Sequence, residues 1–481
     1  MVAFLSEEIH GMVLKTKQIF SAGSRKSSIA TCRKIWPLLA RRKKKRMESR
    51  LTELRAANSR GARPIFRNGF LSEHSLSANS NDPESFHRAM APVLVLAQFF
   101  GVLPVLGLLQ PTPYKLRFVK LSPRTAYATF ITAIVLVMAI LSVLHMIRTL
   151  NSTAFEVQGG IAAATAGAVF YGNCVIGLII FFWLSPRWVT LQRDWRTMEE
   201  FIDSDKTERP KLRWKFYTLS ATVLFLALIE HVLSIAVNSE KHDWNGTSNS
   251  TFQNFLKIYC ANSHAFILET LTYNFALGIF IFIVSKLATF TWNFTDLFIM
   301  LISTGLAERY KTLNKQVTTS VSKHRTIDWT GFREDYAALS CMVKKVDADI
   351  AAIILLSFAN NLYFICLQLL NGLSQPSDSS LLSDIYFFGS FAFLIGRTVV
   401  VTLLTSRIND QSKVALPALY TCSSSTYNVE TERLMQQLTT DDVALTGMRF
   451  FSITRNFMLA VAGAIVTYEV VLLQFNVSMN K

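Results

Sequence analysis

The chain has 481 residues, of which 51% are hydrophobic and only 17% are charged, and its mean hydropathy is +0.30. Soluble domains rarely combine so much apolar content with so little charge, so the composition excludes one large soluble domain as the main body of the chain. The formal net charge of +16 is unevenly distributed along the chain. Residues 1–91 hold 18 Lys and Arg against 7 Asp and Glu and so contribute +11 of it.

The N-terminal segment is the most basic part of the chain. Its centre is the run Arg41-Arg42-Lys43-Lys44-Lys45-Arg46. Such a run can bind nucleic acid, but beside a long membrane domain it is better explained as a cytoplasmic tail facing anionic lipids. Residues 58–82 are rich in Ser, Asn and Arg, which predicts disorder. We therefore expect residues 1–91 to be a basic, largely disordered cytoplasmic tail that binds no nucleic acid.

Eight apolar stretches follow as candidate membrane spans. They cover residues 92–109, 127–147, 161–184, 216–237, 264–291, 350–372, 385–405 and 448–473. The first is barely long enough to cross a hydrocarbon core of about 30 Å, and Pro104 interrupts a helix near its middle. We expect residues 92–126 to form an interfacial or re-entrant helix on the cytoplasmic side instead.

Glycosylation sequons indicate which stretches cross the membrane. Asn293 begins one sequon that is predicted to be unused, on the cytoplasmic side. The other four share one side only if 127–147 is the first crossing, which predicts a glycoprotein modified at Asn151, Asn245, Asn249 and Asn476.

The distribution of Lys and Arg leads to the same topology. The loops 185–215 and 286–349 are rich in both residues, whereas 371–384 has neither. Positive charge collects on the cytoplasmic side. Both signals predict seven spans, a cytoplasmic N-terminus and an extracellular C-terminus, which is opposite to a G-protein-coupled receptor.

The predicted fold class is an all-α polytopic membrane protein with seven transmembrane helices. The region 292–349 has helical apolar spacing and is interpreted as a cytoplasmic anchor that extends the fourth and fifth helices, the alternative being a solvated helical loop. The remaining boundaries, in chain order, are 127–291 for helices 1–4, 350–405 for helices 5–6, 406–447 for a cytoplasmic segment, 448–475 for helix 7 and 476–481 for an extracellular tail.

Motifs of enzymes and cofactor sites are missing from the sequence. It contains no GxxxxGK[ST], HExxH or GxSxG, no GxGxxG after a strand, and no CxxC among its six cysteines. We expect no catalytic residue, no cofactor and no metal.

Polar residues inside the spans are costly in hydrocarbon and therefore mark candidate sites. Under the predicted topology they gather in the outer half of the bundle, where a water-filled cavity would accommodate them. Carboxylates and amides bind hydroxyl groups, and aromatic rings stack on the apolar faces of sugars, so the mixture favours a carbohydrate. The alternative is ordinary hydrogen bonding between packed helices. The candidate ligand-binding residues are Glu230, His231, Glu269, Tyr273, Asn274, Asn361, Tyr363, Gln368, Asp384 and Tyr386.

The last span ends in two neighbouring stripes. Tyr468, Leu472 and Phe475 share one face at helical spacing, and Val471 and Gln474 lie on the face beside it. Both can be packing faces. Alternatively one faces a pore, where bulky apolar side chains gate by excluding water.

This end of the chain resembles the signature of insect gustatory receptors. Thr467-Tyr468, five further residues and then Gln474-Phe475 match their terminal pattern, and 451–455 is similar to the entry of their last helix. The block from Ser85-Phe86-His87 to Pro104-Val105 resembles the sugar-receptor subfamily, which Glu469 also fits.

The resemblance implies a channel of the insect odorant and gustatory receptor type. It implies a homotetramer, or a heterotetramer with related gustatory receptors, whose last helices line a cation pore in the plasma membrane of gustatory receptor neurons. Each subunit would bind a small sugar in its outer half. The implied pore and gate residues are Gln474, Phe475, Leu472, Tyr468 and Val471.

Three other functions stay open at this point. A gustatory or odorant-type channel opened by a bitter or other non-sugar ligand fits the same signature. A secondary transporter would show internal repeats, which are not visible. A G-protein-coupled receptor would have its C-terminus in the cytoplasm.

Overall fold

The structure is a computed structural model that describes residues 82–152, 160–203, 209–240, 251–269, 271–322, 327–373, 380–424 and 427–479. Most of the predicted N-terminal tail lies outside the described residues, as do Asn245 and Asn249. Within the described ranges the regular secondary structure is helical, and two isolated β-bridges join Leu106 to Arg117 and Thr446 to Ser452.

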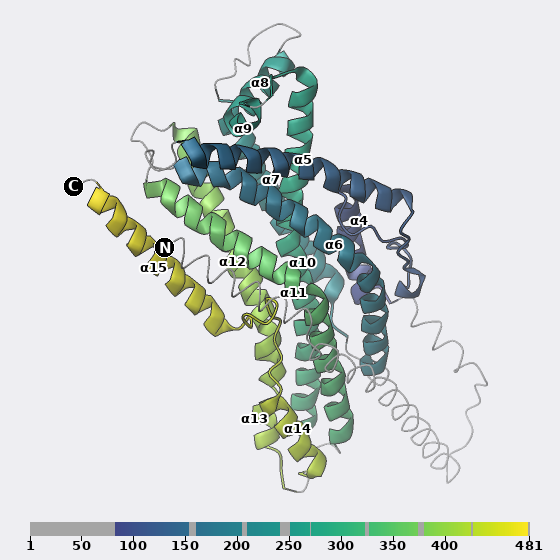
Figure 1. The fold of residues 1–481 in the computed structure, drawn as a ribbon. Coiled ribbons are helices and arrows are strands. Elements are labelled where there is room, and N and C mark those ends of the chain that lie inside the picture. The colour runs from purple at the N-terminus through teal and green to yellow at the C-terminus, as the bar shows by residue number, and fades with distance from the viewer. Residues whose placement is uncertain are drawn as a thin grey trace.

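Thirteen helical elements make up the described chain (Figure 1). They are α4 (Phe86–Phe99), η2 (Pro113–Lys115), α5 (Pro123–Ser152), α6 (Gly160–Asp203), α7 (Leu212–Asn238), α8 (Thr251–Ser263), α9 (Ala265–Leu268), α10 (Phe275–Ser322), α11 (Trp329–Leu373), α12 (Leu381–Lys413), α13 (Leu416–Tyr420), α14 (Val429–Thr440) and α15 (Arg455–Met479).

Six of the described helices are long and apolar enough to cross a membrane: α5, α6, α7, α10, α11 and α12. The helix α15 has 25 residues and corresponds to the seventh predicted span. At 1.5 Å per residue, the 14 residues of α4 cover only about 21 Å, less than the hydrocarbon core. The stretch 92–109 therefore forms no continuous spanning helix, and the chain turns back after Phe99.

Two spans begin later than the sequence predicts. The fourth helix starts at Phe275 rather than 264, because the Asn274 side chain caps it by accepting the Leu277 N–H at 2.8 Å, and α8 and α9 precede it. The last helix starts at Arg455 rather than 448, because Met448 and Arg449 have positive φ angles of 52° and 67° in a turn that the Thr446–Ser452 bridge closes.

The region 292–349 is helical almost throughout, since α10 and α11 run through it as single long helices. Between Asn293 and Val317, α10 has buried residues on all of its faces. This part of the chain is therefore a packed helix rather than a solvated loop. Figure 1 shows these helices reaching toward α13 and α14 at one end of the molecule, with α8 and α9 at the opposite end.

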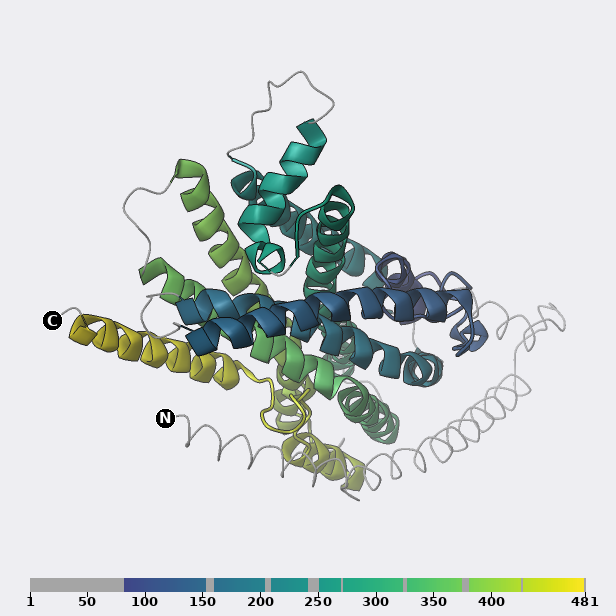
Figure 2. The same cartoon turned by 45° about the horizontal axis from the view of Figure 1, so that its top comes forward.

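The helix α15 diverges from the bundle in both views (Figures 1 and 2). Only its beginning is packed: Phe457 stacks on Phe451 with ring centroids 4.5 Å apart and meets Phe358 edge-on. Most described side chains from Leu459 to Val470 are exposed. A long apolar helix without intramolecular partners needs lipid or another chain to cover it.

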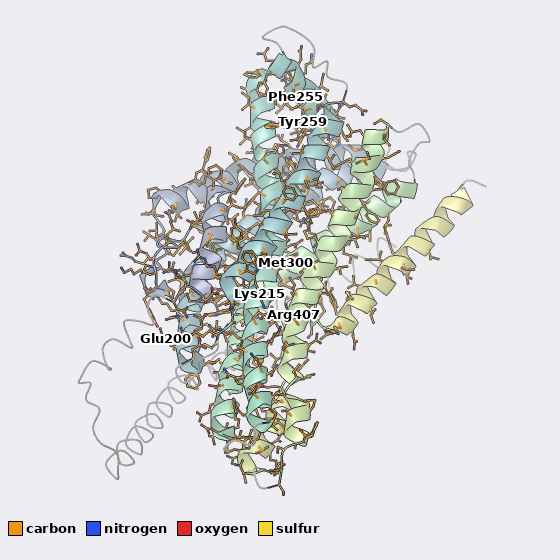
Figure 3. The ribbon with its side chains drawn as sticks, turned by 180° about the vertical axis from the view of Figure 1, so that it is seen from behind. Glu200, Lys215, Phe255, Tyr259, Met300 and Arg407 are labelled. Carbon is orange, nitrogen blue, oxygen red and sulfur yellow. The ribbon has the colours of Figure 1, made fainter. Side chains whose placement is uncertain are left out.

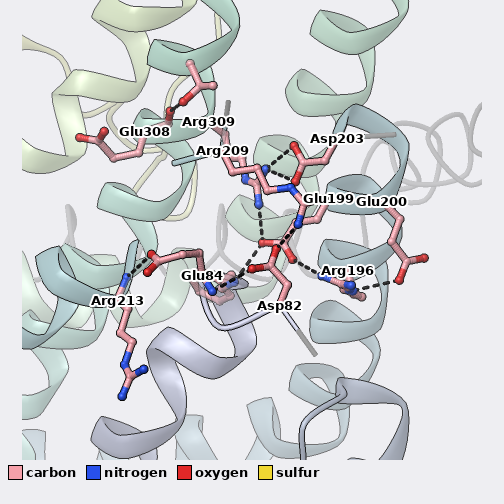
Figure 4. Close-up of polar contacts among 12 residues, drawn as sticks. Asp82, Glu84, Arg196, Glu199, Glu200, Asp203, Arg209, Arg213, Glu308 and Arg309 are labelled. Atoms are coloured by element: carbon pink, nitrogen blue, oxygen red, sulfur yellow. Dashed lines mark hydrogen bonds and ion pairs between the residues drawn. The ribbon is translucent and has the colours of Figure 1, made fainter. Parts of the chain in front are cut away.

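A buried ion-pair network joins α6 to α10 beside α4 (Figure 4). The Arg309 guanidinium donates to both carboxylate oxygens of Asp203 and to Oε1 of Glu199, each at 2.8 Å. The same Glu199 oxygen accepts the backbone N–H of Phe86 at 3.0 Å, and the Phe86 ring stacks on Trp195. Charge-assisted bonds of this kind are the strong ones, so they fix the start of α4 on the helix bundle.

Candidate ligand-binding site and gate

Polar side chains from α7, α11 and α12 meet near the α8 end of the bundle. Ser390 Oγ donates to Glu230 Oε1 and accepts from Gln368 Nε2, both at 3.2 Å. The Tyr386 hydroxyl lies near Glu230 and Ser390. His231 follows Glu230 on α7, about 100° further around the helix, and lies close enough to Lys286 to interact with it electrostatically. We call these five residues the Glu230 cluster; four of them are predicted ligand-binding residues, and Ser390 joins them.

Two buried atoms of this cluster have unused hydrogen-bonding capacity. Gln368 Oε1 and His231 Nε2 have no hydrogen-bond partner among the described residues. Buried polar atoms are nearly always paired, so an unpaired one calls for an explanation. An amide oxygen accepts two hydrogen bonds and an imidazole nitrogen donates or accepts one. These two atoms could therefore each form at least one further hydrogen bond.

A second polar group, with residues from α6, α8, α10 and the start of α9, lies beside the Glu230 cluster. Lys286 Nζ donates to the Tyr259 hydroxyl at 3.0 Å and stands 4.4 Å from the Phe282 ring centroid. The Tyr171 hydroxyl and His264 Nε2 are 2.7 Å apart. Lys286 and Glu230 are close enough to interact electrostatically. This group adds a cation, three six-membered aromatic rings and an imidazole to the same end of the bundle, where Figure 3 labels Tyr259.

The position of Lys286 differs from the one assumed when the positive charges of each loop were compared. The sequence groups it with the positive charges of the 286–349 loop. In the structure α10 begins only at Phe275, so Lys286 lies about three turns into this helix, where it donates to Tyr259 of α8. Its charge belongs to the α8 end of the molecule, and the remaining basic residues of that loop carry the topology argument.

Three predicted ligand residues lie outside the Glu230 cluster, at or just after the end of α9. Glu269 is 63% exposed and pairs with His145 Nδ1 at 3.0 Å. The Tyr273 hydroxyl donates to the Gln253 carbonyl at 3.3 Å, and Asn274 caps α10. These contacts shape the connection between α8 and α10 rather than the cluster.

Three more of the predicted residues have structural partners. The Tyr363 hydroxyl donates to Thr165 Oγ1 at 2.8 Å, which ties α11 to α6. Asp384 lies in the first turn of α12. Asn361 is buried and donates to Asp296 Oδ2 at 3.0 Å. It belongs to a separate network around Arg397 of α12, whose guanidinium also contacts its side chain.

The candidate gate lies on α15, which continues to Met479. The Tyr468 side chain is 43% exposed. The side chains of Val471, Leu472, Gln474 and Phe475 lie outside the described residues, as does that of the predicted glycosylation site Asn476. Asn151 falls in the last turn of α5 and its side chain is likewise outside the description.

Sequence reasoning missed the residues that complete this site from α8 and α10. Tyr259 precedes the predicted fourth span, His264 lies at its first residue, and Lys286 was assigned to the loop that follows it, so none of them was included among the candidates. A signal was present: a lysine eleven residues into a helix capped by Asn274 is one of the ionisable residues that a membrane span rarely carries without a partner.

Comparison with known families decides the relationship. The family model described as "Trehalose receptor" matches residues 41–481. The chain belongs to the trehalose receptor family. Two curated relatives of this trehalose receptor family member are from Drosophila melanogaster: the gustatory receptor for sugar taste 64f, 33% identical over 82% of this chain and 81% of its own length, and the gustatory receptor 5a for trehalose, 31% identical over 90% and 91%.

The fold of this trehalose receptor family member is that of insect olfactory receptors. The structure of olfactory receptor OR5 from Machilis hrabei aligns with a TM-score of 0.60 and 14% identity, covering 82% of this chain and all of that one. The structure of OR5 in complex with eugenol aligns with a TM-score of 0.59. The predicted all-α polytopic membrane fold and the resemblance to sugar-taste receptors are confirmed, and so is the expectation of a receptor rather than an enzyme.

Proposed function

We propose that this chain is a subunit of a sugar-gated, non-selective cation channel in the plasma membrane of taste neurons. The observation that carries the proposal is the Glu230 cluster, whose unpaired Gln368 and His231 atoms suit a polyhydroxylated ligand. The relatives named for sugar taste and trehalose support the same ligand class.

The proposed site combines charge, amide and aromatic groups in one place. Glu230 supplies a carboxylate, Gln368 an amide and Tyr386 a ring with a hydroxyl. Sugars need several hydrogen-bonding groups arranged against a flat apolar surface. An apolar odorant would leave the buried polar atoms of this cluster unpaired, which costs about 1–3 kcal/mol for each.

The proposed assembly is a tetramer, of this chain alone or with related subunits, in which α15 lines the pore. The exposed course of α15 beyond Phe457 supports this arrangement, because it leaves an apolar helix available to other copies. In the proposed topology the N-terminus is cytoplasmic, and Gln474 and Phe475 form the constriction near an extracellular C-terminus.

The test is whole-cell current in cells that express the chain, alone and with related co-receptors, during perfusion with a panel of sugars and bitter compounds. A sugar-evoked current that reverses near 0 mV in mixed sodium and potassium solutions is expected. The absence of any current, with surface expression shown by labelling, would contradict the proposal. A current evoked only by bitter compounds would show that the ligand is not a sugar. A C-terminal tag should be accessible to antibody on intact cells.

A further inference from the structure

A cavity of about 480 Å³ lies between α7 and α12. Its walls are mostly apolar and include Leu219, Val223 and Leu226 of α7, Met300 of α10, and Phe393 and Gly396 of α12. Figure 3 places Met300 near the middle height of the molecule, well away from Tyr259. The cavity is therefore separate from the Lys286 group at the α8 end, and none of its lining residues belongs to the Glu230 cluster.

The rim of the cavity is exposed and apolar. Leu226 is 45% exposed, its neighbour Phe225 61%, and Val400 38%. Both α7 and α12 are membrane-spanning helices. An apolar opening on the outer surface of such helices faces lipid tails rather than water. The acyl chain of a membrane lipid is therefore the group available to fill it.

The end of α7 below the cavity carries two free cations. Lys211 and Arg213 are exposed, and no ion pair joins either to any residue that the structure describes. The neighbouring cations do form ion pairs: Arg209 pairs with Asp82 at 2.8 Å and Lys215 with Glu308 at 2.6 Å. Figure 4 shows the Arg213 side chain directed away from the carboxylates around it.

Exposed aromatic side chains mark this level as the edge of the membrane. Trp214 is 70% exposed and Tyr217 is 68% exposed, and such residues concentrate where headgroups meet hydrocarbon. From Arg213 to Thr218, the first α7 residue of the cavity wall, the helix rises roughly 7–8 Å. This matches the thickness of one interfacial layer, about 5–7 Å. A phosphate bound at Arg213 therefore places acyl chains level with the cavity.

We propose that this is a binding site for an anionic phospholipid, with the headgroup held by Lys211 and Arg213 and one acyl chain in the cavity between α7 and α12. Charge complementarity favours an anionic headgroup over a zwitterionic one, because neither cation has a carboxylate partner within the described part of the chain. Under the proposed topology this headgroup site lies in the cytoplasmic leaflet, and the rest of the proposal does not depend on that topology.

The acyl-chain half of the site is tested with two glycines of α12. A Cβ added at Gly396 or at Gly389 meets no atom within 4 Å, so both positions accept a larger side chain. Only Gly396 lines the cavity. The full-length protein is delipidated in detergent and incubated with phosphatidylserine or phosphatidylcholine, and bound lipid is counted by native mass spectrometry. Gly396→Leu should lower retention of both lipids at least about fivefold, whereas Gly389→Leu should match the unmodified protein.

The headgroup half is tested with charge-matched pairs. Lys211→Gln with Arg213→Gln should weaken phosphatidylserine binding by about fivefold for each cation and leave phosphatidylcholine unchanged. Arg187→Gln with Lys311→Gln removes the same charge at exposed positions away from the cavity and should change neither.

Each contrary result overturns a stated part of the proposal. Equal retention by the two glycine variants would remove the acyl-chain site. Equal weakening by the two charge pairs would reduce the headgroup site to general electrostatics. Binding of a sterol but no phospholipid, or filling of the cavity by a second copy of the chain, would assign the cavity to a different occupant.

Discussion

Arg397 on α12 forms an ion pair with Asp296 on α10, with 2.8 Å between Nε and Oδ2 and exposed side-chain fractions of 2% and 0%. Arg397 also donates to Asn293 and, at 3.3 Å, to Asn361, and it stands 4.6 Å from the Trp292 ring centroid. Charges are rare inside membrane proteins unless they are paired, and this pair ties α10, α11 and α12 together within the bundle.

Asp296→Asn should destabilise the protein by about 3–5 kcal/mol, because it leaves Arg397 buried without a counter-charge. Adding Arg397→Gln should restore most of the loss, since the pair becomes two neutral groups. The measurement is the melting temperature of a fluorescent fusion in detergent, read by size-exclusion chromatography. Lys344→Gln, at an exposed pair with Asp441, is the control and should cost less than about 1 kcal/mol. A double variant as unstable as the single one would contradict the charge-pair explanation.

Glu230→Gln should raise the half-maximal sugar concentration by at least about tenfold, because hydrogen bonds to a charged group contribute roughly 1.5–3 kcal/mol. The reading is the concentration dependence of the evoked current. Glu269→Gln makes the same chemical change at an exposed carboxylate outside the Glu230 cluster and should leave the response unchanged. If both variants respond alike, the ligand does not bind at Glu230.

Phe475→Ala should increase the current that flows without ligand, since a smaller side chain at the proposed constriction no longer excludes water. The comparison is Leu459→Ala, which shortens an exposed side chain sixteen residues earlier on the same helix. Basal current is measured at equal surface expression. A closed state as tight as that of the unmodified channel would argue against a gating role for Phe475.

The stability of the α4 region should decrease below about pH 6.5. Burial lowers the pKa of His87. The hydrogen bond of 3.0 Å between its Nε2 and the Gln110 carbonyl raises the pKa, but the effect of burial is larger. A depressed pKa in the folded state means that the unfolded chain binds the proton first, so stability is complete above the ordinary pKa and declines as the pH falls toward the folded value. Melting temperatures between pH 7.5 and 5.5 should slope less in His87→Gln. Parallel slopes would refute this origin.

The spans were largely predictable because each depends on a local run of apolar residues. For example, the stretch 216–237 lies within α7 (Leu212–Asn238), and 385–405 lies within α12 (Leu381–Lys413). The starts of α10 and α15 were harder, because a cap at Asn274 and a turn with positive φ at Met448 interrupt stretches that remain apolar on average. Hydropathy averages over a window and does not detect a single capping residue.

The candidate site was only partly predictable, for a related reason. Depth along a helix follows from the sequence, and in the structure Glu230, Gln368 and Tyr386 all lie near Ser390. Which residues touch depends on the rotation of each helix and on their positions along it. Asn361 and Gln368 share one side of α11 but lie two turns apart, so one joins the Arg397 network and the other the Glu230 cluster.

That this is a polytopic helical membrane protein of the sugar-taste receptor family could be inferred from the sequence, because span length, polarity and the family's residue patterns are local properties of the chain. Which polar side chains meet could be seen only in the folded structure. Ser390 reaches Glu230 across 160 residues, Lys286 turns out to bond α8, and Arg397 finds Asp296. Such contacts depend on helix rotation and packing between distant segments, where a shift of one residue turns a side chain by about 100° around the helix.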